Sequence, residues 1–231
     1  MNNILKFSED GKSILGVNDS SITSITIPDN VTTIEDWAFS RCTALQSIDV
    51  SKKNPKYASL DGVLYDKELK TIIKFPCNKR ITEYNIPNCV TTIGNSAFWG
   101  CSALQSIDIP NSVTTIEKYA FNECTALQSI DIPNSVTTIG EEAFRRCSAL
   151  QSIDIPNSVT TIEDWAFIGC SALQSINIRI TDIENVNISE WAFNSIDTNN
   201  CVLYIPPGTL WAYRFHPVFG KFKNIEIEKQ D

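Results

Sequence analysis

Apolar and polar residues follow a fixed order that repeats along most of the chain. The order in residues 109–131 is IPNSVTTIEKYAFNECTALQSID, and 23-residue copies of it begin at Ile27, Ile86, Ile109, Ile132 and Ile155. Fourteen of the 23 positions are identical in all five copies. A period of this length predicts a solenoid, in which every copy forms one coil and stacks on the next.

Each copy predicts two short strands on opposite walls of its coil. The end of the copy alternates, so Ile130 and Ile132 lie on one face of a strand and Asp131 on the other. Pro133 ends this strand because proline has no N–H to give to a ladder. Residues 136–139, Val-Thr-Thr-Ile, are β-branched throughout and predict the second strand.

The middle of each copy closes the coil with a compact turn. Ala143-Phe144, Cys147 and Leu150 have the spacing of a single helical or 3-10 turn. A stacked coil buries about eight apolar groups, each contributing roughly 1.5–3 kcal/mol before the entropy of ordering is subtracted. Leu, Ile, Phe and Cys at set positions of such a period are typical of leucine-rich repeats. We therefore expect an α/β leucine-rich-repeat solenoid, a right-handed coil with a parallel β-sheet on one face and short strands and helical or 3-10 turns on the other.

The repeated pattern CxxLxxIxIPxxVTxIxxxAF resembles the BspA-like class of leucine-rich repeats. It covers residues 22–173 closely, with one irregular segment, and the two ends loosely. The resemblance implies a bacterial cell-surface protein of the adhesin type, which holds host matrix proteins or other bacteria and has no catalytic residues. It thus implies a non-enzymatic protein-binding module. The alternative is an intracellular scaffold without a fixed ligand, and a glycan is a second class of partner to consider.

The copies divide the chain into five parts of one expected solenoid over residues 1–231. These are an N-terminal β-hairpin cap (1–21), a first repeat (22–50), an irregular repeat or insert (51–85), four regular repeats (86–177), and a degenerate repeat with a C-terminal cap (178–231). Within the insert, residues 57–65 and 71–76 predict a hairpin. Alignment on Pro76 places Lys74 at the position of the strand aspartate. In the C-terminal cap, residues 207–213 predict a short helix.

Composition and charge exclude several classes of function. The 231 residues contain 42% hydrophobic residues but no apolar run of 18, so we expect no membrane span. The net charge of −8 argues against nucleic acid, and the one basic pair, Arg145-Arg146, occurs in a single copy. The lone His216, with no GxSxG, P-loop, GxGxxG or HExxH motif, indicates neither an enzyme nor a cofactor. Residues 1–13 lack a secretory leader pattern, which leaves the choice between cytoplasm and cell surface open.

The chain has eight cysteines, and five of them hold one repeat position. These are Cys42, Cys101, Cys124, Cys147 and Cys170. A spacing of 23 matches no metal motif, and we expect these thiols to be reduced and buried beside Phe and Leu rather than to form a disulfide or metal ladder. Cys77, Cys89 and Cys201 fall outside the pattern, and their state stays open.

Two sets of residues are candidates for partner binding, and none is a candidate for catalysis, cofactor or metal. The first is aromatic and comprises Trp37, Tyr119, Trp165 and Trp191 at the position before Ala-Phe, together with Trp99 in the following turn. The second is the sheet-face ladder of Asp108, Asp131 and Asp154, with Asp49 before it, Asn177 after it and Lys74 between the first two. Packing on the next coil is the alternative role for the aromatic set. Neighbouring carboxylates about 4.8 Å apart predict raised pKa values. The copies differ most in the turns after Thr-Thr-Ile and after Ala-Phe. These variable turns and the 51–85 insert are therefore better candidates for the partner-binding surface than the sheet.

Overall fold

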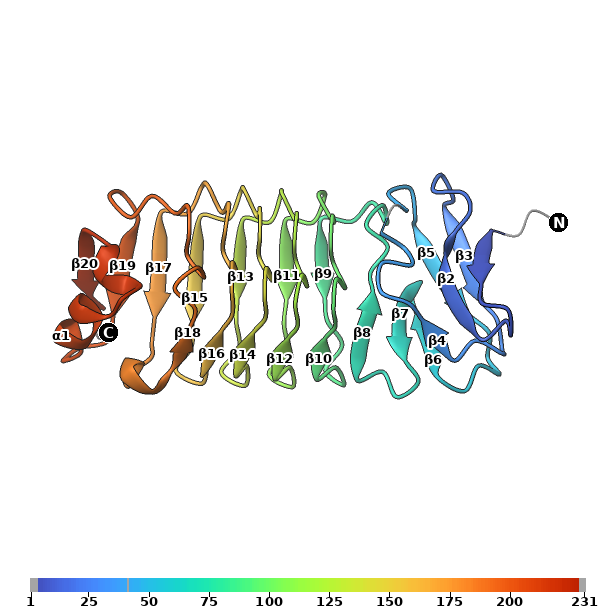
Figure 1. Ribbon diagram of the computed structural model, residues 1–231, viewed down its shortest axis with the longest axis horizontal. Helices are drawn as coiled ribbons and strands as arrows, with labels where there is room; N and C mark the ends of the chain where they lie inside the picture. Colours follow the sequence, from blue (N-terminus) through green and yellow to red (C-terminus); the bar gives the residue numbers. More distant parts are fainter. Residues whose placement is uncertain (1–3, 41, 229–231) are drawn as a thin grey trace.

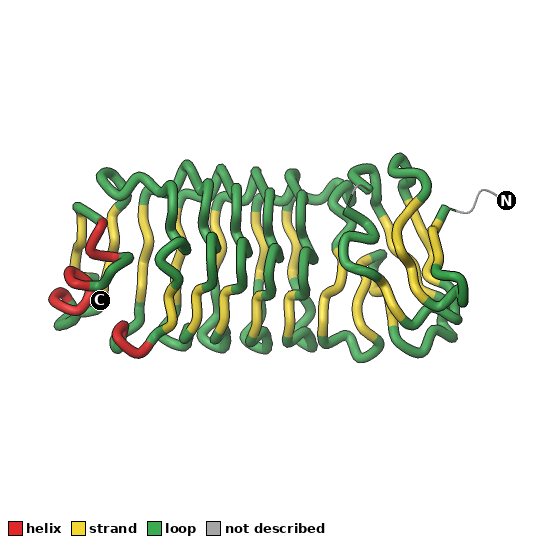
Figure 2. Tube along the Cα trace, viewed as in Figure 1, coloured by secondary structure: helices red, strands yellow, loops and turns green. Residues whose placement is uncertain are grey.

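The protein is an elongated solenoid whose coils lie side by side along its long axis, with strands β2 (Ser13–Val17) and β3 (Ser24–Ile27) near one end and helix α1 (Leu210–Phe215) at the other (Figure 1). The structure is a computed structural model and describes residues 4–40 and 42–228. Residues 1–3 and 229–231, which belong to the two predicted caps, lie outside the described residues. Strands and loops alternate through the whole length, and the α-helix lies at the C-terminal end (Figure 2).

The N-terminal block begins with the expected hairpin. Strands β1 (Leu5–Phe7) and β2 (Ser13–Val17) pair antiparallel, and β2 then pairs in parallel with β4 (Thr33–Ile34). Strand β3 (Ser24–Ile27) pairs in parallel with β5 (Ser47–Val50), as the first repeat predicts. The hairpin thereby covers the open edge of the first coil.

The regular coils form two walls of parallel strands, as the sequence predicts. The strands ending each copy are β9 (Glu83–Asn85), β11 (Ser106–Asp108), β13 (Ser129–Asp131), β15 (Ser152–Ile155), β17 (Ser175–Ile178) and β19 (Val202–Ile205). The opposite wall carries β10 (Thr92–Ile93), β12 (Thr115–Ile116), β14 (Thr138–Ile139), β16 (Thr161–Ile162) and β18 (Asn187–Ile188). Equivalent residues pair in register, for example Ile130 with Ile153. Ile130 and Ile132 are buried, which confirms the predicted faces of the strand.

A ladder of phenylalanine rings runs through the core. Phe75, Phe98, Phe121, Phe144, Phe167 and Phe193 stack in sequence with ring centroids 5.0–5.3 Å apart. The repeat cysteines lie beside this ladder, and the Cys147 thiol donates a hydrogen bond of 3.2 Å to the carbonyl of Phe121 in the preceding coil. Cys124 and Cys170 repeat this contact. These three cysteines are buried and free, as predicted.

The turn that closes each coil has the tight i to i−3 hydrogen bonds of a 3-10 turn, as one alternative of the prediction has it, but it does not continue as a regular helix. Hydrogen bonds such as Ala143 N–H to Gly140 and Cys147 N–H to Phe144 carry it through successive tight turns. Between these bonds Glu142 and Arg146 have φ values of 53° and 57°. Left-handed residues interrupt a helix, so the segment cannot propagate as one.

The position after Thr-Thr-Ile alternates between glutamate and glycine for a structural reason. Gly140 lies so close to the next-door backbone that a Cβ would come within 2.6 Å of the Lys118 nitrogen. The carboxylate of Glu163 reaches back from the following coil and accepts a hydrogen bond of 2.9 Å from the Glu141 N–H. A coil with glycine at this position is therefore followed by a coil with glutamate. The glutamate carboxylate accepts a hydrogen bond from the backbone N–H that follows the glycine.

The irregular segment forms a three-stranded meander. Strands β6 (Tyr57–Leu60), β7 (Val63–Asp66) and β8 (Thr71–Lys74) pair antiparallel, and β8 continues in parallel onto β10. The predicted hairpin is confirmed by the antiparallel pairing of β7 with β8, and the run 57–65 itself contains a second turn, because Asp61-Gly62, with φ values of 50° and 75°, turns the chain between β6 and β7. The placement of Lys74 on the aspartate ladder is wrong, because β8 belongs to the opposite wall.

The meander separates two hydrophobic clusters. The N-terminal cluster extends from Leu5 to Leu64, and the main cluster extends from Val63 to Phe222. Val63 and Leu64, adjacent in strand β7, point into different clusters. The irregular segment therefore joins two packed blocks instead of continuing one uniform stack.

The C-terminal end has the predicted cap. A 3-10 turn (Ile183–Asn185) precedes β18, and helix α1 (Leu210–Phe215) and a second 3-10 turn (Phe219–Lys221) follow β19. Strand β20 (Asn224–Ile227) then pairs in parallel with β19. Within residues 4–40 and 42–228, no helix has the length and apolar character needed to cross a bilayer.

Candidate functional site

In each coil a short segment links the isoleucine of the second strand to the core phenylalanine. This segment is two residues shorter in the irregular coil than in the coils that follow it. Strand pairing aligns Ile72 with Ile93, and Phe75 stacks on Phe98 at 5.1 Å. Five positions separate Ile93 from Phe98, but only three separate Ile72 from Phe75. Two residues, Ile73 and Lys74, thus replace the four that precede phenylalanine in a regular coil.

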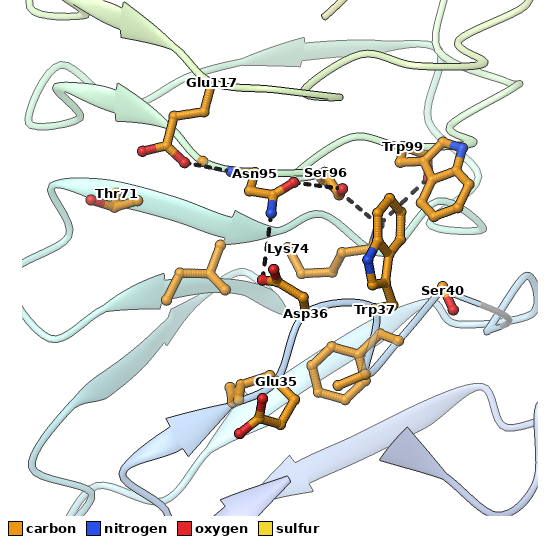
Figure 3. Close-up of a pocket in the computed structure, with 15 residues that line it drawn as sticks. Glu35, Asp36, Trp37, Ser40, Thr71, Lys74, Asn95, Ser96, Trp99 and Glu117 are labelled. Atoms are coloured by element: carbon orange, nitrogen blue, oxygen red, sulfur yellow. Dashed lines mark hydrogen bonds between the residues drawn. The ribbon is translucent and has the colours of Figure 1, made fainter. Parts of the chain in front are cut away.

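The shorter segment leaves a hollow between the first repeat and the first regular coil. We call it the junction groove, and it is lined by Glu35, Asp36, Trp37, Ser40, Thr71, Lys74, Asn95, Ser96, Trp99 and Glu117, among other residues (Figure 3). Its volume is about 200 Å³. A second hollow of about 570 Å³ shares Phe39, Ser40, Lys74 and Trp99 with it.

Two of the aromatic residues predicted as binding candidates, Trp37 and Trp99, line this groove, and a third, Tyr119, packs against Trp37. The rings of Trp37 and Trp99 lie edge to face, with centroids 4.4 Å apart and an interplanar angle of 82°. Tyr119 lies 5.3 Å from Trp37. Trp37 remains 45% exposed although it touches two other rings. The groove therefore presents a fixed aromatic surface to solvent.

Lys74 supports the groove from within the wall. Its Nζ donates hydrogen bonds to the backbone carbonyls of Ser96, at 3.0 Å, and Trp99, at 3.5 Å. Burial of the ammonium lowers the pKa of Lys74 to about 8. The Lys74 ammonium is thus still charged at pH 7, and it donates its hydrogen bonds to backbone carbonyls of the neighbouring coil.

Polar groups complete the rim. Asn95 donates through its side-chain amide to Asp36 Oδ1 at 3.4 Å and through its backbone N–H to Glu117 Oε2 at 2.8 Å. The Ser96 hydroxyl donates to Asn95 Oδ1 at 2.9 Å. Asp36 and Asn95 are 59 residues apart in the sequence, so the groove is held together across the irregular segment. The Glu35 side chain is exposed beside them.

A disulfide lies behind the groove. Cys77 of the irregular segment and Cys101 of the first regular coil are bonded, with Cα atoms 4.3 Å apart. The prediction that Cys101 is reduced is therefore wrong, although its burial is as expected. The shorter segment brings Cys77 next to the sulfur of Cys101. In the sequence, the other coils have no second cysteine at the position of Cys77. Cys89 and Cys201, whose state was open, are free.

The other two predicted aromatic residues lie elsewhere. Trp165 occupies the same repeat position as Trp37, within the identical sequence Glu-Asp-Trp-Ala-Phe, but it is half-buried on the regular wall. Trp191 is 48% exposed and borders an acidic hollow with Glu141, Glu163 and Glu190. Neither has a ring partner among the residues that the structure describes.

The aspartate ladder is shorter than predicted. Asp131 pairs in register with Asp154, and Asp154 with Asn177, whereas Asp49 belongs to a separate sheet. Asp154 also has a partner that the sequence did not reveal, because Arg179 lies 2.5 Å from its carboxylate. Burial nevertheless raises the pKa of Asp154, with smaller opposing contributions from the arginine. The described residues contain no group of three side chains arranged to hold a metal ion.

Asp108 lies on the same wall as the ladder, in strand β11, where it pairs in register with Asn85. The sequence prediction thus places it correctly on the sheet face. A hollow of about 570 Å³ lies on this wall and is lined by Asp131, Asp154, Tyr204, Glu226 and Glu228 among other residues, but Asp108 is not part of its lining.

One exposed surface was missed by the sequence analysis. Trp211 and Phe215 on helix α1 are 73% and 77% exposed, and their rings stack in parallel at 5.5 Å. Their spacing of four residues, with Tyr213 buried between them, is the available sequence signal. His216 follows them, and burial lowers its pKa while its Nδ1 accepts a hydrogen bond from the Val218 N–H. This histidine is part of the packing of the cap.

The stacked 23-residue coils define the chain as a solenoid of the leucine-rich-repeat class. The family model described as a BspA type leucine-rich repeat region, in six copies, matches residues 17–73 and 70–200. The chain belongs to this family, whose leucine-rich repeats are in general protein-interaction modules. No curated protein matches the sequence.

Solved bacterial structures share the fold. A leucine-rich cell surface protein from Faecalibacterium prausnitzii is 33% identical over 91% of this chain, with a TM-score of 0.66. The pneumococcal vaccine antigen PcpA is 21% identical over 97% of this chain, with a TM-score of 0.67, and shows the fold alone. The chain spans 49% of the first structure and 62% of the second.

Proposed function

We propose that this chain is a binding module of a bacterial cell-surface protein and that it holds a protein partner at the junction groove. The observation that carries the proposal is the pair of Trp37 and Trp99 at the hollow, with Tyr119 packed against Trp37. Exposed Trp and Tyr are the residues that most often dominate protein interfaces. The likeness to a cell surface protein of Faecalibacterium prausnitzii supports the location.

The groove is favoured over the sheet face because two tryptophan rings meet there beside charged groups. The ladder of Asp131 and Asp154 repeats one side chain and offers a partner little to distinguish one coil from another. The groove instead combines residues from the first repeat, the irregular segment and two regular coils. It also rests on a fixed framework, because Lys74 and the Cys77–Cys101 disulfide tie these coils together.

The repeat supplies a matched control for testing the groove. Trp37 and Trp165 occupy identical pentapeptides, so Trp37→Ala and Trp165→Ala delete the same side chain from the same local sequence. The labelled chain and both variants are applied to an array of purified extracellular-matrix and bacterial surface proteins. A double variant, Trp211→Ser with Phe215→Ser, tests the exposed pair on the cap.

We expect at least one array protein to bind the wild type and Trp165→Ala equally, and to bind Trp37→Ala about tenfold or more weakly. Circular dichroism confirms that each variant is folded. The proposal is overturned if no array protein binds, if Trp165→Ala loses as much affinity as Trp37→Ala, or if only the cap variant loses binding.

A further inference from the structure

We infer that the junction groove takes an arginine side chain from an exposed segment of its protein partner. This inference rests on the proposed function and specifies the chemistry of the occupant. It is drawn from the charges, the aromatic surface and the size of the groove.

The charges around the groove favour a cation. Three carboxylates, those of Glu35, Asp36 and Glu117, line it against one ammonium, that of Lys74. The ammonium is already hydrogen-bonded to two backbone carbonyls inside the wall. Among residues 4–40 and 42–228, Glu35 has no hydrogen-bond or ion-pair partner for its carboxylate, and Asp36 accepts only the 3.4 Å bond from Asn95. The rim therefore retains unsatisfied acceptor capacity and net negative charge.

The aromatic surface distinguishes arginine from other cations. Trp37 is 45% exposed and is held at a fixed angle by Trp99 and Tyr119. A planar guanidinium stacks on such a ring and at the same time donates a fork of N–H groups to a neighbouring carboxylate. Asp36 is adjacent to Trp37 in the chain and supplies that carboxylate. A lysine ammonium, as a compact point charge, cannot make both contacts in one plane.

The size of the groove fits one side chain. Its volume of about 200 Å³ has room for a single long side chain rather than for a folded surface element. Its position between two coils leaves the approach open to an extended or looped segment of a partner. The proposal therefore concerns one anchoring side chain surrounded by less specific contacts.

The second Glu-Asp-Trp-Ala-Phe sequence lacks the ring cluster of the groove, although its Glu163 and Asp164 line the acidic hollow beside Trp191. Asp164 already accepts a hydrogen bond from the Ser189 hydroxyl. Trp165 is half-buried and has no ring partner in the described part of the chain. Residues 163–167 have the same sequence as residues 35–39 but different neighbours. Substitutions in this second copy are therefore a direct control for substitutions at the groove.

The test uses a fluorescein-labelled octapeptide of alternating glycine and arginine, and the same peptide with citrulline in place of arginine. Citrulline keeps the shape of arginine but is neutral. Fluorescence anisotropy measures both peptides against wild type, Asp36→Asn, Trp37→Ala, Asp164→Asn and Trp165→Ala. A lysine peptide of the same length is the third probe.

We expect the arginine peptide to bind wild type at least tenfold more tightly than the citrulline or lysine peptide. Asp36→Asn and Trp37→Ala should each weaken it about fivefold or more, while Asp164→Asn and Trp165→Ala change it less than twofold. Asp36→Asn is nearly isosteric, so it keeps the test valid if Trp37→Ala loses stability. Equal binding of arginine and citrulline peptides, or equal losses in the 164–165 controls, overturns the inference. If the arginine inference fails in this way but the protein found on the array still needs Trp37 for binding, the proposed function stands without the arginine inference.

Discussion

Reduction of the Cys77–Cys101 disulfide should destabilise the protein measurably. The bond closes a loop with a sequence separation of 24. Removing a cross-link over a loop of this length costs about 3 kcal/mol in the chain-entropy description. For a protein of this size each kcal/mol shifts the midpoint by roughly 2–4 °C, so the expected loss is about 6–12 °C. The bond joins the irregular segment to the first regular coil, and the loss should arise at this junction.

Thermal melts with and without a phosphine reductant measure this effect. Cys77→Ser should melt at the temperature of the reduced wild type and should not respond to reductant. Cys147→Ser, at the repeat position of Cys101 but with no partner sulfur, should still respond. Identical melting temperatures for oxidised and reduced wild type, or eight free thiols by mass spectrometry of the native protein, would refute the reasoning.

Other predictions concern the repeat itself. Gly140→Ala should cost about 3 kcal/mol, because its Cβ would meet backbone at 2.6 Å. Gly100→Ala, in open space at φ 76°, should cost only about 1 kcal/mol, and urea unfolding compares them. Burial raises the pKa of Cys124 from 9.0 to about 12, so the folded state keeps a proton that the unfolded state loses. This one thiol should lower the stability by roughly 1.4 kcal/mol per pH unit above pH 9, in addition to the other buried thiols, and Cys124→Ala should lessen the fall by that amount in melts at pH 8 and 10. Asp131→Asn should stabilise the protein by up to about 1 kcal/mol at low salt, because it removes repulsion from Asp154, and melts at high salt should show a smaller gain. A gain that is independent of salt would point to a different partner for Asp131.

The periodic pattern was sufficient to predict the coil. Every repeat carries apolar residues at the same positions. A single copy is therefore enough to infer that Ile130 and Ile132 point into the core and that equivalent phenylalanines such as Phe121 and Phe144 lie side by side. The caps were also accessible, because the Asp-Gly turn near the N-terminus and the Pro-Gly-Thr start of helix α1 are local signals.

The groove could not be predicted, because it depends on how the irregular segment pairs with its neighbours. Alignment on Pro76 placed Lys74 with the aspartates, whereas strand pairing and the stacking of Phe75 on Phe98 set the true register. The Cys77–Cys101 disulfide follows from the same register. A local pattern cannot choose between the two alignments, since Phe75 suits both the apolar position before the repeat proline and the position of the core phenylalanine.

The left-handed residues were missed for a different reason. Trp37, Tyr119, Glu142 and Trp165 all have φ between 53° and 65°, yet none is the glycine or asparagine that usually marks this conformation. The stacked coils impose the conformation, with hydrogen bonds such as Tyr119 N–H to the Glu141 carbonyl. The same backbone conformation occurs at the regular wall and at the groove. Only the surroundings of Trp37 make it a binding candidate.

The indole N–H signals of the five tryptophans provide the most direct test of the junction groove as the binding site. Each signal in a ¹⁵N correlation spectrum can be assigned by Trp→Phe substitution, and the partner found on the array is then titrated in. The expected result is that the signals of Trp37 and Trp99 shift or broaden while those of Trp165, Trp191 and Trp211 stay in place. A shift confined to Trp211, or saturation binding that leaves Trp37 and Trp99 unchanged, would contradict the groove as the binding site.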